Sequence, residues 1–323
     1  MARFLIRRIL LGLFTMWLVT VGVFLIFFVG GGPNSVARRL AGKLATAQDI
    51  ARIKDQLLLD RSIFVQYGHF LWQLVWHHSL GYDYYNQVSV NSLVGAAFPI
   101  TLSLVIGASI LWLVMGVLSG IVSAVKTRSL WDRSLTTLAL LFYSMPTFVL
   151  GFLLLLALYY ELTIHGLSIF PAPGYTYSFT QNPLLWGREL ILPWFTLALV
   201  SAATYTRLTR GSMLDVSGED YIRTARSKGM TERRVIFKHT LRSALTPVVT
   251  QFGIDVGTLL GGVIITETVF QLPGLGWTSV KAIGNYDLPL IMGVVIIASA
   301  GVVAANVLVD VGYAVLDPRV RLH

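Results

Sequence analysis

Few side chains in this sequence have the type and spacing that catalysis or metal binding requires. The chain has no cysteine and six histidines, of which only His77 and His78 are adjacent. Neighbouring residues do not share a helix face and no third ligand is spaced to join them, so no metal site is predicted. Neither an H-E-x-x-H nor a G-x-S-x-G motif occurs, and we therefore expect that the chain is not an enzyme.

One polar segment nevertheless carries an ordered pattern of helix signals. Ser217 is placed to cap a short helix, and Glu219 and Asp220 suit the positive end of its dipole. Gly229 follows the last turn, where a left-handed residue is favoured. Thr231 then precedes a second helix that leads into an apolar segment. The pattern predicts a short projecting helix that docks in a groove of a partner protein. The alternative is an ordinary solvated basic loop.

The elements that must hold this segment are apolar. Of the 323 residues, 55% are hydrophobic and 13% are charged, and the formal net charge is +9. Soluble domains carry about 25% charged residues. The composition therefore excludes a soluble globular domain, and it also excludes a disordered chain. The basic charge is interpreted as a marker of membrane topology rather than of nucleic-acid binding.

Six apolar stretches are long enough to be considered membrane spans. Pro146 and Pro193 are expected to kink the third and the fourth of them. With six spans, most of the 25 Lys and Arg residues fall on the side that carries both termini, nine of them between spans four and five. We therefore expect both termini to be cytoplasmic. The expected spans cover residues 9–29, 99–125, 135–160, 191–205, 247–270 and 288–315.

The long segment between the first two spans is expected to lie outside the cytoplasm. Residues 45–59 have helical spacing, with Thr46 as a plausible N-cap. Residues 70–79 are rich in Trp and His, which predicts an amphipathic piece at the membrane interface.

Two features inside the spans could contribute to translocation or packing. Asp255 lies within span five, where a charge is costly. It could attract a cationic group of a substrate in the pathway, or it could be a hydrogen-bonded group between helices. Small residues recur every four positions in two spans and predict close helix packing: Gly253, Gly257 and Gly261 in span five, and Gly116 and Gly120 in span two.

The segment RTARSKG, residues 223–229, with the following ERRVIFKHTLRSALTPVVT, resembles the EAA coupling loop of ATP-binding-cassette importer permeases. More narrowly, it resembles the dipeptide/oligopeptide permease family. The stretches ETVFQLPGLGW, NVLVDVGYAVLDPRVR, MARFLIRRIL and LLLDRSIFVQYGHFLW agree with this, so the resemblance covers nearly the whole chain. Arg223 and Thr224 depart from the wider E-A-A pattern, and so do His239, Leu241 and Arg242 at the later I-x-L-P.

The resemblance implies an all-α membrane protein with six transmembrane helices and the type I ABC importer permease fold. A long extracytoplasmic segment would follow helix 1. The implied domains are residues 1–93, holding the first helix and that segment, and residues 94–315, holding helices 2–6. The second of these includes a cytoplasmic coupling loop at 207–246, and a cytoplasmic tail occupies 316–323.

The implied function is that of a permease subunit of an ATP-driven importer of di- or oligopeptides in the cytoplasmic membrane. Its partners would be a homologous second permease in a heterodimer, two ABC ATPase subunits, an extracytoplasmic peptide-binding protein and the lipid bilayer, with no nucleic acid. No cofactor is expected on this chain, because ATP and Mg would bind the ATPase subunits. The absence of a G-x-x-x-x-G-K-[ST] loop from the sequence agrees with this. The residues implied in coupling are Glu219, Asp220, Tyr221, Arg223, Thr224, Ala225, Arg226, Lys228 and Gly229.

Two alternatives remain at this point. A permease of the same family could carry nickel or glutathione. A secondary transporter is less favoured, because it should show internal repeats, and no second copy of any segment is evident in the sequence.

Overall fold

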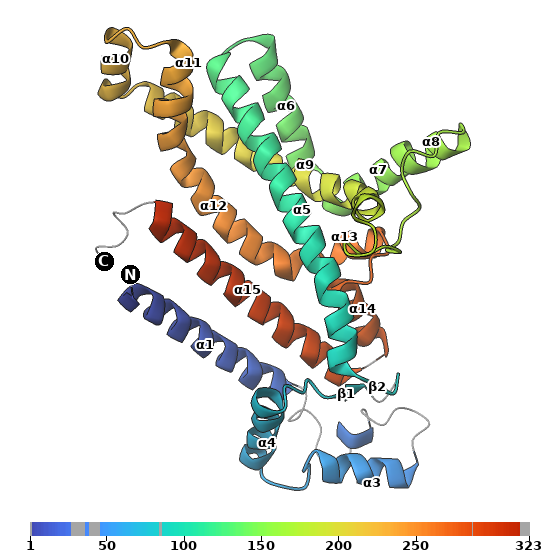
Figure 1. Ribbon diagram of the computed structural model, residues 1–323. Coiled ribbons are helices and arrows are strands. Elements are labelled where there is room, and N and C mark those ends of the chain that lie inside the picture. The colour runs from blue at the N-terminus through green and yellow to red at the C-terminus, as the bar shows by residue number, and fades with distance from the viewer. Residues whose placement is uncertain (1, 27–35, 39–45, 84–85, 286, 317–323) are drawn as a thin grey trace. The chain divides into compact units, whose positions relative to one another are not determined.

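The computed structural model describes residues 2–26, 36–38, 46–83, 86–285 and 287–316, which are mostly helical (Figure 1). The chain forms two compact units that do not follow its order. The first unit comprises Met1–Leu102, Leu260–Ile264 and Pro273–His323, and the second comprises Ser103–Leu259 and Ile265–Leu272. Three helices, α5, α12 and α13, therefore contribute residues to both units.

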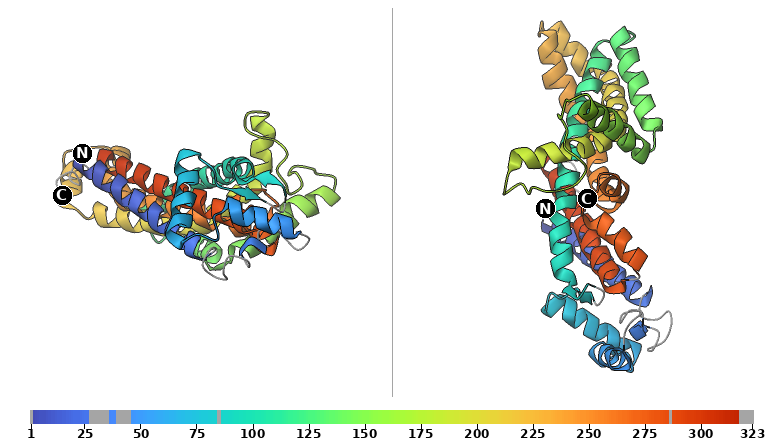
Figure 2. Two further views of the ribbon diagram at one scale, coloured as in Figure 1. Left: turned by 90° about the horizontal axis from the view of Figure 1, so that it is seen from below. Right: turned by 90° about the vertical axis from the view of Figure 1, so that its right-hand side faces the viewer.

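The first unit contains two long helices that lie side by side, α1 and α15, in every view (Figures 1 and 2). A Cβ added at Gly12 of α1 would lie 2.8 Å from Cγ1 of Val303 of α15, so the two helices are in close contact. A core of Val90, Leu275 and Leu290 joins α5, α14 and α15. The elements of this unit are α1 (Ala2–Phe24), α3 (Ala47–Gln56), α4 (Ile63–Trp76), β1 (Tyr82–Asp83), β2 (Val88–Ser89), the start of α5 (Val90–Val125), α14 (Leu275–Asn285) and α15 (Leu288–Leu316).

The small elements of the first unit follow the sequence signals. Thr46 caps α3 in a capping box: its hydroxyl accepts the Asp49 amide, and its own amide donates to the Asp49 carboxylate. This confirms the predicted cap.

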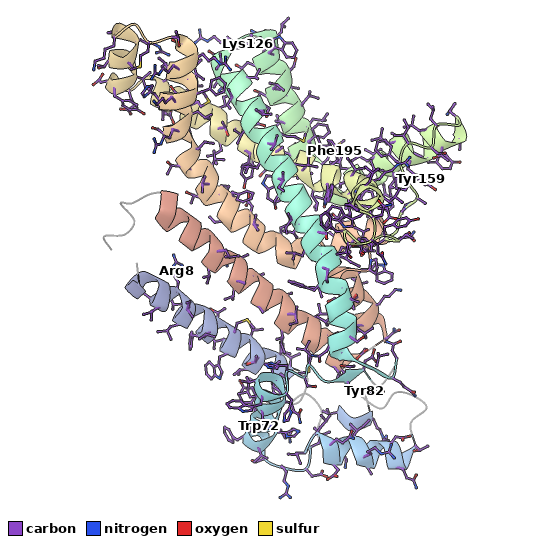
Figure 3. The ribbon with its side chains drawn as sticks, in the orientation of Figure 1. Arg8, Trp72, Tyr82, Lys126, Tyr159 and Phe195 are labelled. Atoms are coloured by element: carbon purple, nitrogen blue, oxygen red, sulfur yellow. The ribbon has the colours of Figure 1, made fainter. Side chains whose placement is uncertain are left out.

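The Trp72 and Trp76 rings stack 5.0 Å apart on the exposed face of α4 (Figure 3). Such a surface suits a membrane interface. The two short strands pair antiparallel, with Tyr82 opposite Ser89.

The second unit is built around α9. Asn182 caps this helix through the Leu185 amide, and Pro183 occupies its first position, where a missing N–H costs nothing. The remaining elements are α6 (Leu130–Ser144), α7 (Thr147–Leu154), the π-helical η2 (Leu155–Tyr160), α8 (Glu161–Ile164), α9 (Pro183–Ser217), α10 (Asp220–Ser227), α11 (Glu232–Arg234), the π-helical η3 (Val235–Thr240), α12 (Leu241–Gly262) and α13 (Ile264–Val269).

Helix α5 packs against α9 through its glycines. A Cβ at Gly120 would lie 2.6 Å from Thr209 Cβ and 2.9 Å from Thr206 O, and one at Gly116 would lie 2.9 Å from Ala202 O. The predicted small face of span two is therefore a helix-packing surface. On α12, Gly253 and Gly257 are buried, whereas the surroundings of Gly261 lie outside the described residues. A packing role for these three glycines stays a prediction.

Within the described residues, five helices are long and apolar enough to cross a membrane: Ile6–Phe24, Val90–Val125, Thr147–Ile164, Pro183–Ser217 and Leu288–Leu308. Four of them coincide with expected spans, and two of those, α5 and α9, begin eight or more residues earlier than expected. The first expected span ran to residue 29, and residues 27–29 lie outside the described residues.

The expected third span, residues 135–160, is wrong as a single helix. Helix α6 ends at Ser144, and α7 begins after Pro146, which has no N–H to continue the ladder. By contrast, α9 continues through Pro193. The expected fifth span, 247–270, is divided between α12 and α13 and is not among the five long apolar helices. A sixth span therefore stays a prediction.

Candidate coupling site

The short helix predicted in the polar segment is present as α10, but it starts two residues later than the Ser217 cap implied. The Ser217 hydroxyl donates to Met213 O, and Ser217 is the last residue of α9, with Gly218 as the C-cap. Glu219 is the N-cap residue instead, with extended backbone at φ −67° and ψ 146°. Asp220 lies in the first turn, as predicted. The Ser217 cap is therefore wrong, because the preceding helix extends through that residue.

The end of α10 has the geometry that the sequence predicted. Gly229 has φ +75°, and an added Cβ there would meet no atom within 4 Å, so only the backbone conformation demands glycine. The Gly229 amide donates to Arg226 O at 2.9 Å, and the Met230 amide donates to Ala225 O at 3.4 Å. These two bonds form a Schellman motif. Thr231 then takes the extended conformation of the next N-cap, as predicted.

The inner face of α10 is closed by an apolar cluster. Ile222 and Val235 are fully buried, and Ala225 is 6% exposed. Val216 and Met230 pack against them. Sequence reasoning missed Ile222 and Val235, although the three-residue spacing of Ile222 and Ala225 marks one helix face. Ala225, which the resemblance implies in coupling, lies on this inner face, because the face packs against Val235 of η3.

The outer face of α10 is polar and open to solvent. The Asp220 and Arg223 side chains are 99% and 71% exposed, and their 3.7 Å ion pair is of the surface kind that contributes little to stability. Thr224 and Lys228 are exposed with them. The helix thus has one face fixed to its own chain and one face free to meet a partner.

Two polar contacts tie α10 to the elements that follow it. Arg226 donates to both carboxylate oxygens of Glu232, from Nη2 at 2.8 Å and from Nε at 3.2 Å. This contact lowers the pKa of Glu232. Tyr221 donates its hydroxyl to Ser243 Oγ of α12 at 3.1 Å. A displacement of α10 therefore reaches α11 and α12 through direct bonds.

A buried carboxylate anchors the C-terminal part of α9, the part that leads into α10. Asp132 of α6 accepts Arg210 Nε at 2.9 Å and Nη2 at 3.0 Å, the amide of Arg128 at 2.9 Å, and the hydroxyl of Ser123. The Arg210 guanidinium holds the pKa of Asp132 far below its usual range. Sequence reasoning missed this network, since no local pattern links residues 78 positions apart.

Asp255 is hydrogen-bonded between helices. It accepts the Tyr205 hydroxyl of α9 at 2.9 Å and Gln251 Nε2 at 2.8 Å. The Trp112 ring lies 6.2 Å from that of Tyr205 and 6.1 Å from that of Phe252. This arrangement matches the second of the two interpretations of Asp255. A role in the pathway stays a prediction.

No group of three His, Cys, Asp or Glu residues that could hold a metal ion occurs in the described part of the chain. What the arrangement around α10 can do is mechanical: it can transmit force from a bound partner to α9 and α12.

Comparisons with known proteins agree with this description. The family model for binding-protein-dependent transport system inner membrane components matches residues 116–322, and the model for their N-terminal part matches residues 1–105. A probable peptide ABC transporter permease of Sinorhizobium fredii is 36% identical over 321 residues, covering 99% of this chain and 100% of the relative. The dipeptide transport system permease protein of Escherichia coli is 36% identical over 344 residues, covering 99% of each chain.

A solved structure shows the same fold. A chain of the inward-facing MetNI methionine ABC transporter aligns with a TM-score of 0.54 at 18% identity, covering 70% of this chain and 96% of that chain. The expected ABC importer permease fold is thereby confirmed. The full-length relatives and the two family models together identify the chain as a multi-pass inner membrane protein that belongs to the family of binding-protein-dependent transport system inner membrane components.

Proposed function

We propose that this chain is the translocation subunit of an ATP-driven peptide importer, and that the outer face of α10 docks on an ATPase subunit. The observation that carries the proposal is the two-faced character of α10. Ile222 and Ala225 on its inner face pack against Val235 of η3 and are buried. Asp220 and Arg223 on its outer face are exposed to solvent. A helix fixed in this way is suited to receive force on one side and pass it on from the other.

Transmission would follow the bonds around α10. The Schellman turn at Gly229 fixes the angle between α10 and α11, and the Arg226 to Glu232 pair spans that turn. Tyr221 links α10 directly to Ser243 of α12. Closure of an ATPase dimer would thus move α9 and α12 as rigid elements, a shear or hinge motion.

The substrate and partners rest on the relatives. Two full-length relatives carry names that specify peptide or dipeptide transport, which supports a peptide as the cargo. The family description names a binding protein, which we place on the extracytoplasmic side. The further partners that we propose are a homologous second permease, in a heterodimer, and two ATPase subunits that hold ATP and Mg. Both termini would be cytoplasmic, as the distribution of Lys and Arg indicates.

The proposal is tested by uptake of a labelled dipeptide and of tetra-alanine into proteoliposomes containing both permeases. Import is expected only when the ATPase subunits, ATP and the binding protein are all present. Uptake that persists without the ATPase subunits would show a secondary transporter instead. ATP-dependent uptake of nickel or glutathione, but of neither peptide, would show that the same transporter carries a different substrate.

A further inference from the structure

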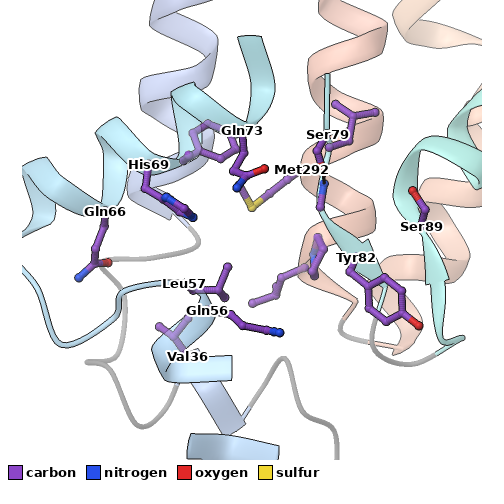
Figure 4. Close-up of a pocket in the computed structure, with 15 residues that line it drawn as sticks. Val36, Gln56, Leu57, Gln66, His69, Gln73, Ser79, Tyr82, Ser89 and Met292 are labelled. Carbon is purple, nitrogen blue, oxygen red and sulfur yellow. Dashed lines mark hydrogen bonds between the residues drawn. The ribbon is translucent and has the colours of Figure 1, made fainter. Parts of the chain in front are cut away.

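A cavity of about 510 Å³ lies within the first unit (Figure 4). Its walls come from the end of α3, one face of α4, the residues around β1 and β2, and the first turn of α15. By the expected topology this part of the chain lies outside the cytoplasm. The volume is within the usual range for small-molecule sites, about 300–1,000 Å³.

The lining of this cavity combines amides with apolar side chains and carries no full charge. None of the fifteen described lining residues is Asp, Glu, Lys or Arg. Three are glutamines, and the other polar members are His, Ser and Tyr. One glutamine is structural: Gln66 Nε2 donates to Leu59 O at 3.1 Å and to Arg61 O at 2.8 Å, which fixes α4 to the preceding turn.

Two polar side chains in the wall are available to a ligand. His69 and Gln73 lie one turn apart on α4 and point toward the same open space, with Met292 near Gln73 (Figure 4). Neither side chain forms a hydrogen bond with any other described residue. Together they offer both donors and acceptors.

These features restrict the chemistry of the occupant. An ionic ligand would lose hydration without gaining a counter-charge from the described walls. A hydrocarbon chain would displace water from His69 and Gln73 and leave both side chains without hydrogen-bond partners. A neutral chain that alternates amide groups with small apolar side groups satisfies both the polar and the apolar parts of the lining. That is the chemistry of a peptide backbone.

We propose that this cavity binds the backbone of a transported peptide through His69 and Gln73, without recognising the charges at its termini. The site gives the importer a place to hold cargo outside the membrane. This inference rests on the proposed function, since it takes its ligand from the peptide cargo.

The test uses the assembled transporter in lipid nanodiscs, without the binding protein. The probes are tetra-alanine and its neutral form, N-acetyl-tetra-alanine amide, and binding is measured by saturation-transfer NMR. The wild type should bind both peptides with similar affinity. The double variant His69→Leu with Gln73→Leu should bind both about tenfold more weakly, the loss of one or two hydrogen bonds. The matched control Gln48→Leu changes an exposed glutamine of α3 outside the cavity and should bind like the wild type.

A second variant separates recognition from damage to the fold. Gln73→Glu keeps the shape of the side chain but adds a negative charge. A third probe, tetra-alanine amide, has a free ammonium group and no carboxylate, so this variant should bind it severalfold more tightly than the acetylated peptide. Absence of this preference, or equal binding by the double variant and the wild type, would overturn the site. Displacement of bound peptide by decanoate would assign the cavity to acyl chains instead. If wild-type proteoliposomes import peptide but the nanodiscs bind none, only this inference fails; loss of import as well means that the proposed function fails.

Discussion

Arg226 of α10 and Glu232 of α11 form a two-point ion pair, at 2.8 and 3.2 Å, across the turn that Gly229 makes. Both side chains are about half exposed, so the pair contributes little to overall stability. The pair matters for its geometry, because two parallel hydrogen bonds from one guanidinium fix the relative orientation of the two side chains as well as their distance.

Disrupting this pair should weaken coupling more than stability. Glu232→Gln is expected to lower the stimulation of ATP hydrolysis by loaded binding protein, with a change in unfolding free energy below about 1 kcal/mol. The exchanged double variant, Arg226→Glu with Glu232→Arg, should recover much of the stimulation. ATPase assays and thermal unfolding of the reconstituted complex measure both. A large fall in the unfolding temperature with unchanged stimulation would contradict this interpretation.

The angle between α10 and α11 depends on a left-handed residue. Gly229→Val should strain the backbone by about 1–2 kcal/mol and uncouple ATP hydrolysis from transport, because φ +75° is unfavourable for a branched side chain. Gly218→Val is the matched control, since Gly218 has φ −82°. Transport is compared in proteoliposomes that contain the same amount of inserted protein. Equal transport by the two variants would show that the turn at Gly229 is not needed for coupling.

The Asp132 network should be required for the packing of α6 on α9. Asp132→Ala leaves Arg210 without its carboxylate and should lower the unfolding free energy by roughly 2–3 kcal/mol, the value of hydrogen bonds to a charged group. Asp215→Ala, at an exposed carboxylate of α9, the helix that carries Arg210, is the control. The thermal unfolding temperature in detergent reports the difference, and equal values for the two variants would refute the prediction.

A carboxyl pair makes the first unit sensitive to pH. Burial and the neighbouring Asp83 raise the pKa of Asp287 to about 7 from 3.8. The folded state therefore keeps a proton that the unfolded chain releases, so this contribution to stability is complete below pH 4 and is lost as the pH rises through about 7. The Leu290 amide donates to Asp287 at 3.2 Å and should exchange hydrogen faster at pH 8 than at pH 5, after correction for intrinsic rates. Asp287→Asn should abolish this difference, and its persistence in the variant would exclude Asp287 as the cause.

Local signals predicted the ends of the short helices well. The capping box at Thr46, the left-handed Gly229 and the N-cap at Thr231 each depend on a few adjacent residues, and the structure has all three. The Ser217 cap was wrong, because α9 continues through Ser217 and the hydroxyl donates to Met213 O of the preceding turn instead. Pro146 was expected to kink a helix, but it separates two of them.

Long-range contacts could not be found in the same way. The Asp132 to Arg210 pair joins residues 78 positions apart, and no spacing rule connects them. The buried face of α10 could have been predicted, because Ile222 and Ala225 are one turn apart. It was missed because most of the residues around them in the sequence are charged or polar. The sequence therefore did not show that Ala225, one of the residues implied in coupling, would be buried.

The contact between the outer face of α10 and an ATPase subunit is the central claim, and single-cysteine crosslinking tests it most directly. The chain has no cysteine of its own, so Thr224→Cys places one reactive group on that face, and Thr180→Cys places one on an exposed segment elsewhere in the same unit. With a short bifunctional reagent in the assembled transporter, Thr224→Cys should crosslink to the ATPase with a yield that changes on ATP binding, and Thr180→Cys should not. A crosslink to the ATPase from Thr180→Cys, or none from Thr224→Cys in a complex that still imports peptide, would contradict the account.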